Sequence, residues 1–259
     1  MAAGDVAVNI TSNNARAGAK FDGVDDRITH GATDFSYQVD GNMTWSFWVN
    51  KRSGLNQFIF GKGSGGQFEY AMIFDSNSKL SFDMWDLAGN AHAGITSGTA
   101  SNQNEWIYVT IVYVNDTSLQ MFINGVDSGS DLTLANNPAQ GTAEFVIGNR
   151  ATDAGRWFKG TLSDLRIWDR DLTQTEITKV FNGGDVTKGL KHRYKLDTDY
   201  TDSAGDKDGT NTGTYFTIED DSISSVISGQ RVVASASGAY IQTGMKGGQI
   251  VSVAVTETA

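Results

Sequence analysis

The chain has 259 residues and a formal net charge of −10. This acidic balance argues against nucleic acid and against an anionic membrane surface as partners, because both bind clustered Lys and Arg. Cysteine is absent, which excludes thiolate metal sites and thiol nucleophiles, and no apolar run approaches the ~20 residues of a membrane span, so membrane insertion is not expected.

Strand-like segments recur along the first two thirds of the chain, separated by turns rich in Gly and Asn. Residues 106–114 are apolar on both faces, which predicts a central strand that is covered on both sides. Asn124-Gly125 is a strong hairpin signal. The predicted strands are Met43–Val49, Gln57–Phe60, Phe68–Phe74, Lys79–Trp85, Trp106–Val114, Leu119–Ile123, Phe145–Ile147 and Gly160–Trp168.

One short helix is predicted after these strands, near residues 173–182. Thr173 fits the N-cap, and Glu176, three residues later, fits its capping-box partner. Gly183 stands where a glycine commonly ends a helix. Because the capping box uses Glu176, this carboxylate is not a catalytic candidate.

Seven short motifs follow one another in order between residues 17 and 183. They are Phe21–Gly23, Thr44–Val49, Phe58–Lys62, Asn104–Thr110, Leu119–Gly125, Phe145–Gly148 and Phe158–Trp168 with the helix after it. In this order they resemble the concanavalin A-like, laminin G-like jelly-roll domains of the bacterial and viral branch. The resemblance implies a two-sheet antiparallel sandwich, usually non-enzymatic, that binds glycans, proteins or Ca²⁺ on one edge or serves as a rigid surface module.

The chain departs from the usual order of this family after the helix. Residues 192–196 and 202–210 resemble a segment that normally precedes such a domain. Tyr194 and Leu196 alternate with charged residues as in a one-sided strand, which favours packing of residues 190–216 back onto the sandwich as an edge strand and loop.

Residues 217–259 are poor in aromatic residues and rich in Ser, Ala, Gly and Val. Such a segment buries little by itself, so it is expected to pair with the sandwich or with another chain. The predicted fold is therefore all-β: a jelly-roll sandwich with one short helix, plus a small C-terminal β segment. The predicted organisation is an N-terminal arm (1–16), the sandwich (17–216) and a C-terminal β arm or small subdomain for assembly (217–259).

Two groups of aspartates are candidate Ca²⁺ ligands, since Ca²⁺ takes 6–8 oxygen ligands. The first group comprises Asp22, Asp25, Asp26 and Asp164, where Asp164 is expected beside the turn because the first and last strands pair in the family. The second group comprises Asp202, Asp206 and Asp208 in one loop. Alternatively, these aspartates bond their own backbone in turns, and Asp164 pairs with an arginine, Arg166 or Arg27.

Two tryptophans are candidate glycan contacts. Trp45, Trp48, Trp106 and Trp168 lie inside strand motifs and are expected in the core. Trp85 and Trp157 lie at strand ends, where an exposed ring can stack on a sugar.

Catalysis is not expected. Glycoside hydrolysis requires two carboxylates, about 5–5.5 Å or about 6.5–9.5 Å apart, and these project into one cleft from alternate strand positions. The chain contains no such acidic pattern, and its three histidines show no metal-ligand spacing.

Two functions remain open. The first is a virion structural protein, a capsid decoration or tail component on the virion surface. It would assemble with other subunits through the C-terminal arm as an oligomer, and it could also bind a host-surface glycan. This hypothesis follows from the absence of a secretory signal at the N-terminus. The alternative is a Ca²⁺-dependent carbohydrate-binding lectin module of a bacterial surface or secreted protein, with its signal removed.

Overall fold

The computed structural model describes residues 16–31, 35–36, 41–64, 67–85, 91–115, 117–129, 142–150 and 155–219. The chain divides into two compact units, one of Gly18–Phe216 and one that combines Met1–Ala17 with Thr217–Ala259. Most of the predicted N-terminal and C-terminal arms, residues 1–15 and 220–259, lies outside the described residues. Within the described part of the chain, no helix has both the length and the apolar character of a membrane span.

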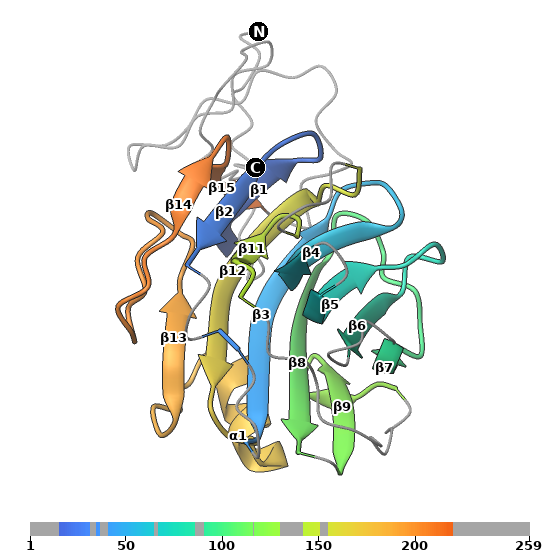
Figure 1. Cartoon of the computed structure of the whole chain (residues 1–259), viewed down its shortest axis with the longest axis vertical. Helices are drawn as coiled ribbons and strands as arrows, with labels where there is room; N and C mark the ends of the chain where they lie inside the picture. The colour runs from blue at the N-terminus through green and yellow to red at the C-terminus, as the bar shows by residue number, and fades with distance from the viewer. Residues whose placement is uncertain are drawn as a thin grey trace, which may run out of the picture. The chain divides into compact units, whose positions relative to one another are not determined.

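The described residues of the unit Gly18–Phe216 form two antiparallel β-sheets and one helix (Figure 1), which confirms the predicted jelly-roll sandwich. In the first sheet the strand order is β10, β9, β8, β3, β12 and β1, and β13 also pairs with β12. These strands are β1 (Arg16–Asp22), β3 (Met43–Lys51), β8 (Trp106–Val114), β9 (Ser118–Ile123), β10 (Val126–Asp127), β12 (Lys159–Trp168) and β13 (Leu190–Tyr194).

The second sheet has the strand order β14, β2, β11, β4, β5, β6 and β7. Its strands are β2 (Arg27–His30), β4 (Gln57–Ser64), β5 (Gln67–Phe74), β6 (Leu80–Trp85), β7 (Ala91–Thr96), β11 (Phe145–Ile147) and β14 (Thr210–Thr212). The last strand, β15 (Tyr215–Glu219), crosses the boundary between the two units.

Aromatic side chains fill the space between the sheets. The Trp45 ring of β3 lies 5.0 Å from the Tyr70 ring and 4.9 Å from the Phe82 ring of the opposite sheet, centroid to centroid. Phe47, two residues further along β3, meets Phe60 edge-on at 5.2 Å. All five rings are fully buried, and burial of one such side chain contributes about 1.5–3 kcal/mol. The alternate residues of β3 therefore build the core, as the period of two requires.

The helix α1 (Gln174–Phe181) begins at the predicted N-cap. Thr173 N donates to Glu176 Oε2 at 2.9 Å, and Glu176 N donates to Thr173 Oγ1 at 3.3 Å. Arg170 donates to both carboxylate oxygens of Glu176, at 2.7 and 2.9 Å. The buried face of α1 packs with Tyr108 and Trp168 in a second apolar cluster, so the helix covers the outer side of the sheet.

After the helix the chain returns to the sandwich. β13 pairs antiparallel with the half of β12 that leads to α1, so that Tyr194 lies opposite Leu165 (Figure 1). Tyr194 and Leu196 are fully buried. β14 then joins the second sheet at its edge beside β2. Residues 190–212 therefore contribute a strand to each sheet.

Candidate functional site

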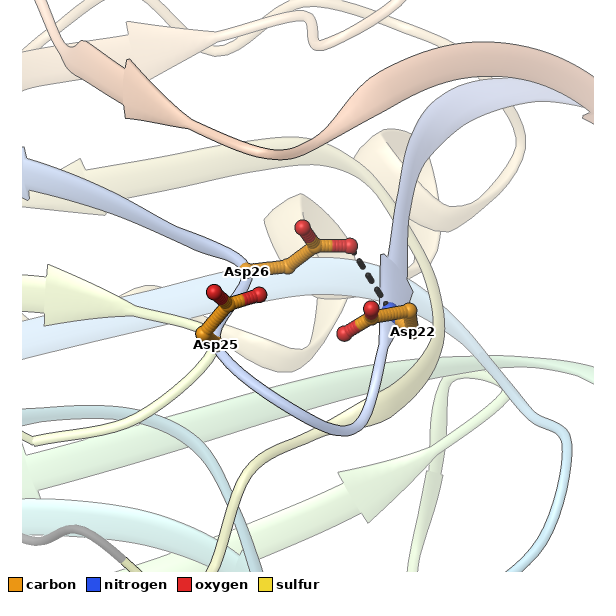
Figure 2. A group of neighbouring side chains, drawn as sticks. All are labelled: Asp22, Asp25 and Asp26. Carbon is orange, nitrogen blue, oxygen red and sulfur yellow. Dashed lines mark hydrogen bonds between the residues drawn. The ribbon is translucent and has the colours of Figure 1, made fainter.

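Three aspartates gather at the turn between β1 and β2. Ligand atoms of Asp22, Asp25 and Asp26 lie within 4.8 Å of one another (Figure 2). Asp26 is buried and its Oδ2 accepts a hydrogen bond from Asp22 N at 2.8 Å. Asp22 Oδ1 accepts from Val24 N at 2.7 Å. Two carboxylate oxygens of the turn thus accept hydrogen bonds from backbone N–H groups of the same turn, as turn aspartates commonly do. The three carboxylates nevertheless remain close to one another.

Burial and neighbouring charges both disfavour ionisation of Asp26 in this turn. Burial raises the pKa of the Asp26 carboxyl above its ordinary value, and the charges of Asp22 and Asp25 add to this effect, against the hydrogen bond from Asp22 N. A cation among the three carboxylates would relieve this repulsion. Asp22 and Asp25 are exposed, so they remain accessible. The three residues supply fewer oxygens than the 6–8 of a Ca²⁺ shell, so water and carbonyl groups would complete it.

Asp164 does not belong to this turn. In the pairing of β1 with β12, Asp22 lies opposite Lys159, and Asp164 is five residues further along β12, about 16 Å away. Its carboxylate accepts two bonds from Arg166, at 3.0 and 2.7 Å, and one from Arg193, at 2.9 Å. Burial alone would raise the pKa of Asp164, but the two arginines hold it below its ordinary value. The expected position beside the turn is therefore wrong, and the alternative, a pair with Arg166, is the observed one.

The second group of aspartates does not converge on one point. Asp202 accepts hydrogen bonds from His192 Nδ1 at 2.6 Å and from Arg193 N and Gly205 N at 2.9 Å. Asp208 accepts from Asp202 N at 2.8 Å.

Asp206 points away from this network, since its side chain is 87% exposed and lies 3.5 Å from Lys207 Nζ. Among the described residues, only Asp22, Asp25 and Asp26 meet the spacing for a shared metal ion. The structure therefore does not bring the carboxylates of Asp202, Asp206 and Asp208 together, and hydrogen bonds engage both oxygens of Asp202 and Oδ1 of Asp208.

The two candidate tryptophans are half-buried. The Arg27 guanidinium lies 5.9 Å from the centroid of the Trp157 ring. Since Arg27 follows Asp26 directly, this places Trp157 near the acidic turn. Trp85 ends β6 opposite Ala91 of β7. Both rings stay candidate contact residues, on different parts of the sandwich surface.

A pocket of about 610 Å³ lies where β12 ends and β13 begins. Its polar lining comprises Ser36, Asp169, Lys191, His192 and Asp206, and its apolar lining includes Met43, Ile167 and Leu190. No sequence motif predicts this site, because its side chains come from positions 36 to 206. Of its lining residues, only Asp206 is a candidate site residue in the sequence, and there as a Ca²⁺ ligand.

Hydrogen bonds and ion pairs organise the pocket wall. Lys191 Nζ lies 3.0 Å from Asp169 Oδ2, and both side chains are partly exposed. Ser36 Oγ donates to Glu69 Oε1 at 3.1 Å. That same oxygen lies 3.0 Å from Lys62 Nζ, in an ion pair whose two side chains are fully buried. The Ser36 hydroxyl of the pocket wall is thus held by the buried Lys62–Glu69 ion pair, which water does not reach.

Two packed antiparallel sheets and, in the part of the chain that the structure describes, a single helix define a β-sandwich module. The chain belongs to the concanavalin A-like lectin/glucanases superfamily, because the Laminin_G_3 family model matches residues 22–178, more than half of the chain. Laminin G-like domains of this kind are typically non-catalytic binding modules.

A curated relative and several solved structures are similar to this chain. Mouse usherin (Mus musculus) is 20% identical over 152 residues, which cover 56% of this chain and 3% of usherin. A "putative carbohydrate binding protein" from Bacteroides ovatus has a TM-score of 0.63 at 17% identity, over 80% of this chain and 61% of its own. A heptameric SAP-like pentraxin from Limulus polyphemus has a TM-score of 0.54 at 15% identity, over 79% and 95%. At these identities the structures establish the shared fold alone.

Proposed function

We propose that this chain is a non-enzymatic carbohydrate-binding module whose ligand occupies the pocket between Asp169 and His192. The pocket itself carries the proposal. Its volume of about 610 Å³ falls in the range of about 300–1,000 Å³ that ligand sites occupy. It combines an apolar wall with a few convergent polar groups, which is the usual composition of a small-molecule site.

The chemistry of the wall suits a sugar. Each sugar hydroxyl can donate and accept a hydrogen bond. The Asp169 carboxylate accepts and the Lys191 ammonium donates, and these groups lie 3.0 Å apart, so two neighbouring hydroxyls could engage one each. Met43 and Leu190 offer apolar contact to the C–H face of a sugar ring. The similarity in fold to the Bacteroides ovatus protein supports the same proposal.

A glycan array followed by calorimetry tests this function. The double variant Asp169→Ala/Lys191→Ala should lose binding, while Lys179→Ala, an exposed lysine on α1, should retain it. Trp85→Ala and Trp157→Ala in the same series test the two predicted stacking contacts. Failure of the purified chain to retain any glycan would refute the proposal.

For the acidic turn we propose a Ca²⁺ ion held by Asp22, Asp25 and Asp26. The mutual proximity of the three carboxylates and the raised pKa of Asp26 support it. The ion would shield the turn and order the loop next to Arg27 and Trp157.

We also propose, as the finer role, display of this module on a virion surface through residues 217–259. The support is the resemblance to the bacterial and viral branch of the family and the composition of this segment. Deletion of residues 220–259 should abolish association with partner subunits in size-exclusion chromatography with light scattering. A truncated chain that associates like the full chain would refute this role.

A further inference from the structure

Two ion pairs lie at the part of the pocket that the structure describes. The Asp169 carboxylate has Lys191 as its partner at 3.0 Å, and Asp206 lies 3.5 Å from Lys207. Asp169, Lys191 and Asp206 line the pocket, whereas Lys207 stands outside the lining. The acceptor and the donor that Asp169 and Lys191 present to a ligand are therefore already paired with each other.

The His192 ring of the wall is held by a carboxylate that lies behind it. His192 Nδ1 lies 2.6 Å from Asp202 Oδ2, and backbone N–H groups of Arg193 and Gly205 bind the other oxygen. These contacts hold the pKa of Asp202 at about 2 although its burial acts in the opposite direction. The Asp202 carboxylate is thus stabilised by these hydrogen bonds and does not itself line the pocket.

Ser36 is fixed from behind in the same way. Its hydroxyl proton points to Glu69, and Glu69 is held by Lys62 in a fully buried ion pair. Lys62 also donates to the carbonyl of Ala143 at 2.7 Å. A hydroxyl that has donated its proton still offers lone pairs, so Ser36 can accept a hydrogen bond from a ligand. Lys62 and Glu69 act as positioning residues for Ser36.

We propose that this pocket selects neutral sugars over uronic acids and amino sugars, an inference that rests on the carbohydrate-binding function proposed above. A carboxylate on the ligand would compete with Asp169 for Lys191, and an ammonium would compete with Lys191 for Asp169. Either replacement breaks the Asp169–Lys191 pair and leaves one protein charge without its partner, which costs free energy on the scale of an exposed ion pair. A neutral hydroxyl binds both members of the pair and breaks neither.

The test uses calorimetric titration of the full chain with hexose oligomers, the matching uronic acid oligomers and the matching hexosamine oligomers. The wild type should bind the neutral series at least about threefold more tightly than either charged series, the scale of an exposed ion pair. Its affinity for the neutral series should change little between low and high salt.

Two variants should shift the preference in opposite directions. Asp169→Asn leaves Lys191 without its carboxylate and should favour the uronic acids about two- to fivefold. Lys191→Gln leaves Asp169 without its ammonium and should favour the hexosamines by a similar factor. Glu105→Gln and Lys179→Gln make the same charge changes at exposed positions outside the pocket lining, and they should leave the preference as in the wild type.

The outcomes separate the two proposals. If the wild type binds none of the three series, the carbohydrate-binding function fails, and this inference with it. If it binds charged and neutral oligomers equally, or if the two pocket variants behave like their controls, only the inference of neutral-sugar selection is overturned.

Discussion

His30 should make the stability of the sandwich depend on pH between about 4 and 6.5. The His30 side chain is 2% exposed and lies among aromatic rings, with centroids 4.5 Å from Tyr194, 5.4 Å from Phe35 and 5.5 Å from Phe145. Burial lowers the pKa of His30 from 6.5 to about 4. An imidazolium in this position would be desolvated, so the folded protein holds the neutral ring.

The sign of the effect follows from proton uptake. Below pH 6.5 the unfolded chain binds a proton at His30 that the folded chain does not bind until the pH approaches 4. The stabilisation from the neutral ring is therefore complete above pH 6.5 and is lost as the pH falls to 4. A difference of about 2.5 pKa units corresponds to about 3 kcal/mol, a large fraction of the 5–15 kcal/mol of a typical domain.

The assay is urea unfolding, followed by tryptophan fluorescence, at several pH values between 7.5 and 4 for the wild type and for His30→Phe. Phenylalanine suits the aromatic surroundings and cannot titrate. The wild type should lose about 3 kcal/mol more unfolding free energy than the variant over this range.

Other groups do not obscure the comparison. Burial raises the pKa of Asp26 and of Asp83, whose protonation acts in the opposite direction, but both are present in the two proteins. The stabilisation linked to Asp202, with its pKa of about 2, is lost only at lower pH. Parallel pH profiles for the wild type and His30→Phe would refute the reasoning.

Three further predictions concern the helix cap, the acidic turn and the buried ion pair. Glu176→Ala removes the capping-box partner and the acceptor of Arg170, and it should lower the free energy of unfolding by about 1–2 kcal/mol in urea titration; an unchanged midpoint would contradict this. Added Ca²⁺ at ~100 times its dissociation constant should stabilise the wild type by about 2.7 kcal/mol and leave Asp26→Asn unaffected in thermal melting; no shift in the wild type would argue against the ion. Lys62→Met removes the cation from the buried Glu69 and should lower the free energy of unfolding by about 3–5 kcal/mol. The double variant Lys62→Met/Glu69→Leu should recover most of this loss. If Lys62→Met alone is as stable as the wild type, the ion pair contributes nothing to stability.

The fold could be predicted from the sequence because its signals are local. The alternation of β3 places Trp45 and Phe47 in the core, and the spacing of Thr173 and Glu176 defines the start of α1. Pairing register is not local, and this is why the position of Asp164 was predicted wrongly. β12 spans ten residues, and which part of it β1 contacts depends on contacts across the whole sheet. Likewise, turn aspartates and metal-binding aspartates look alike in a sequence, since only the geometry shows whether backbone N–H groups have taken the oxygens.

The pocket depends on β13 and the loop after it, the segment in which the chain departs from the order usual in the family. β1 pairs with β12 from Lys159 to Leu162, and β13 pairs with β12 from Leu165 to Trp168. One side of β12 is thus shared by two strands, and Asp164, with a φ of 49°, stands at the junction between them. The strand that fills the second half brings Lys191 and His192 to the end of β12, and the loop after it brings Asp206. A sandwich that lacked residues 190–206 would lose most of the polar wall of the pocket, whereas Asp22, Asp25 and Asp26 lie on the turn between β1 and β2. Binding of sugars in the pocket and binding of a cation at the turn should therefore respond to separate substitutions.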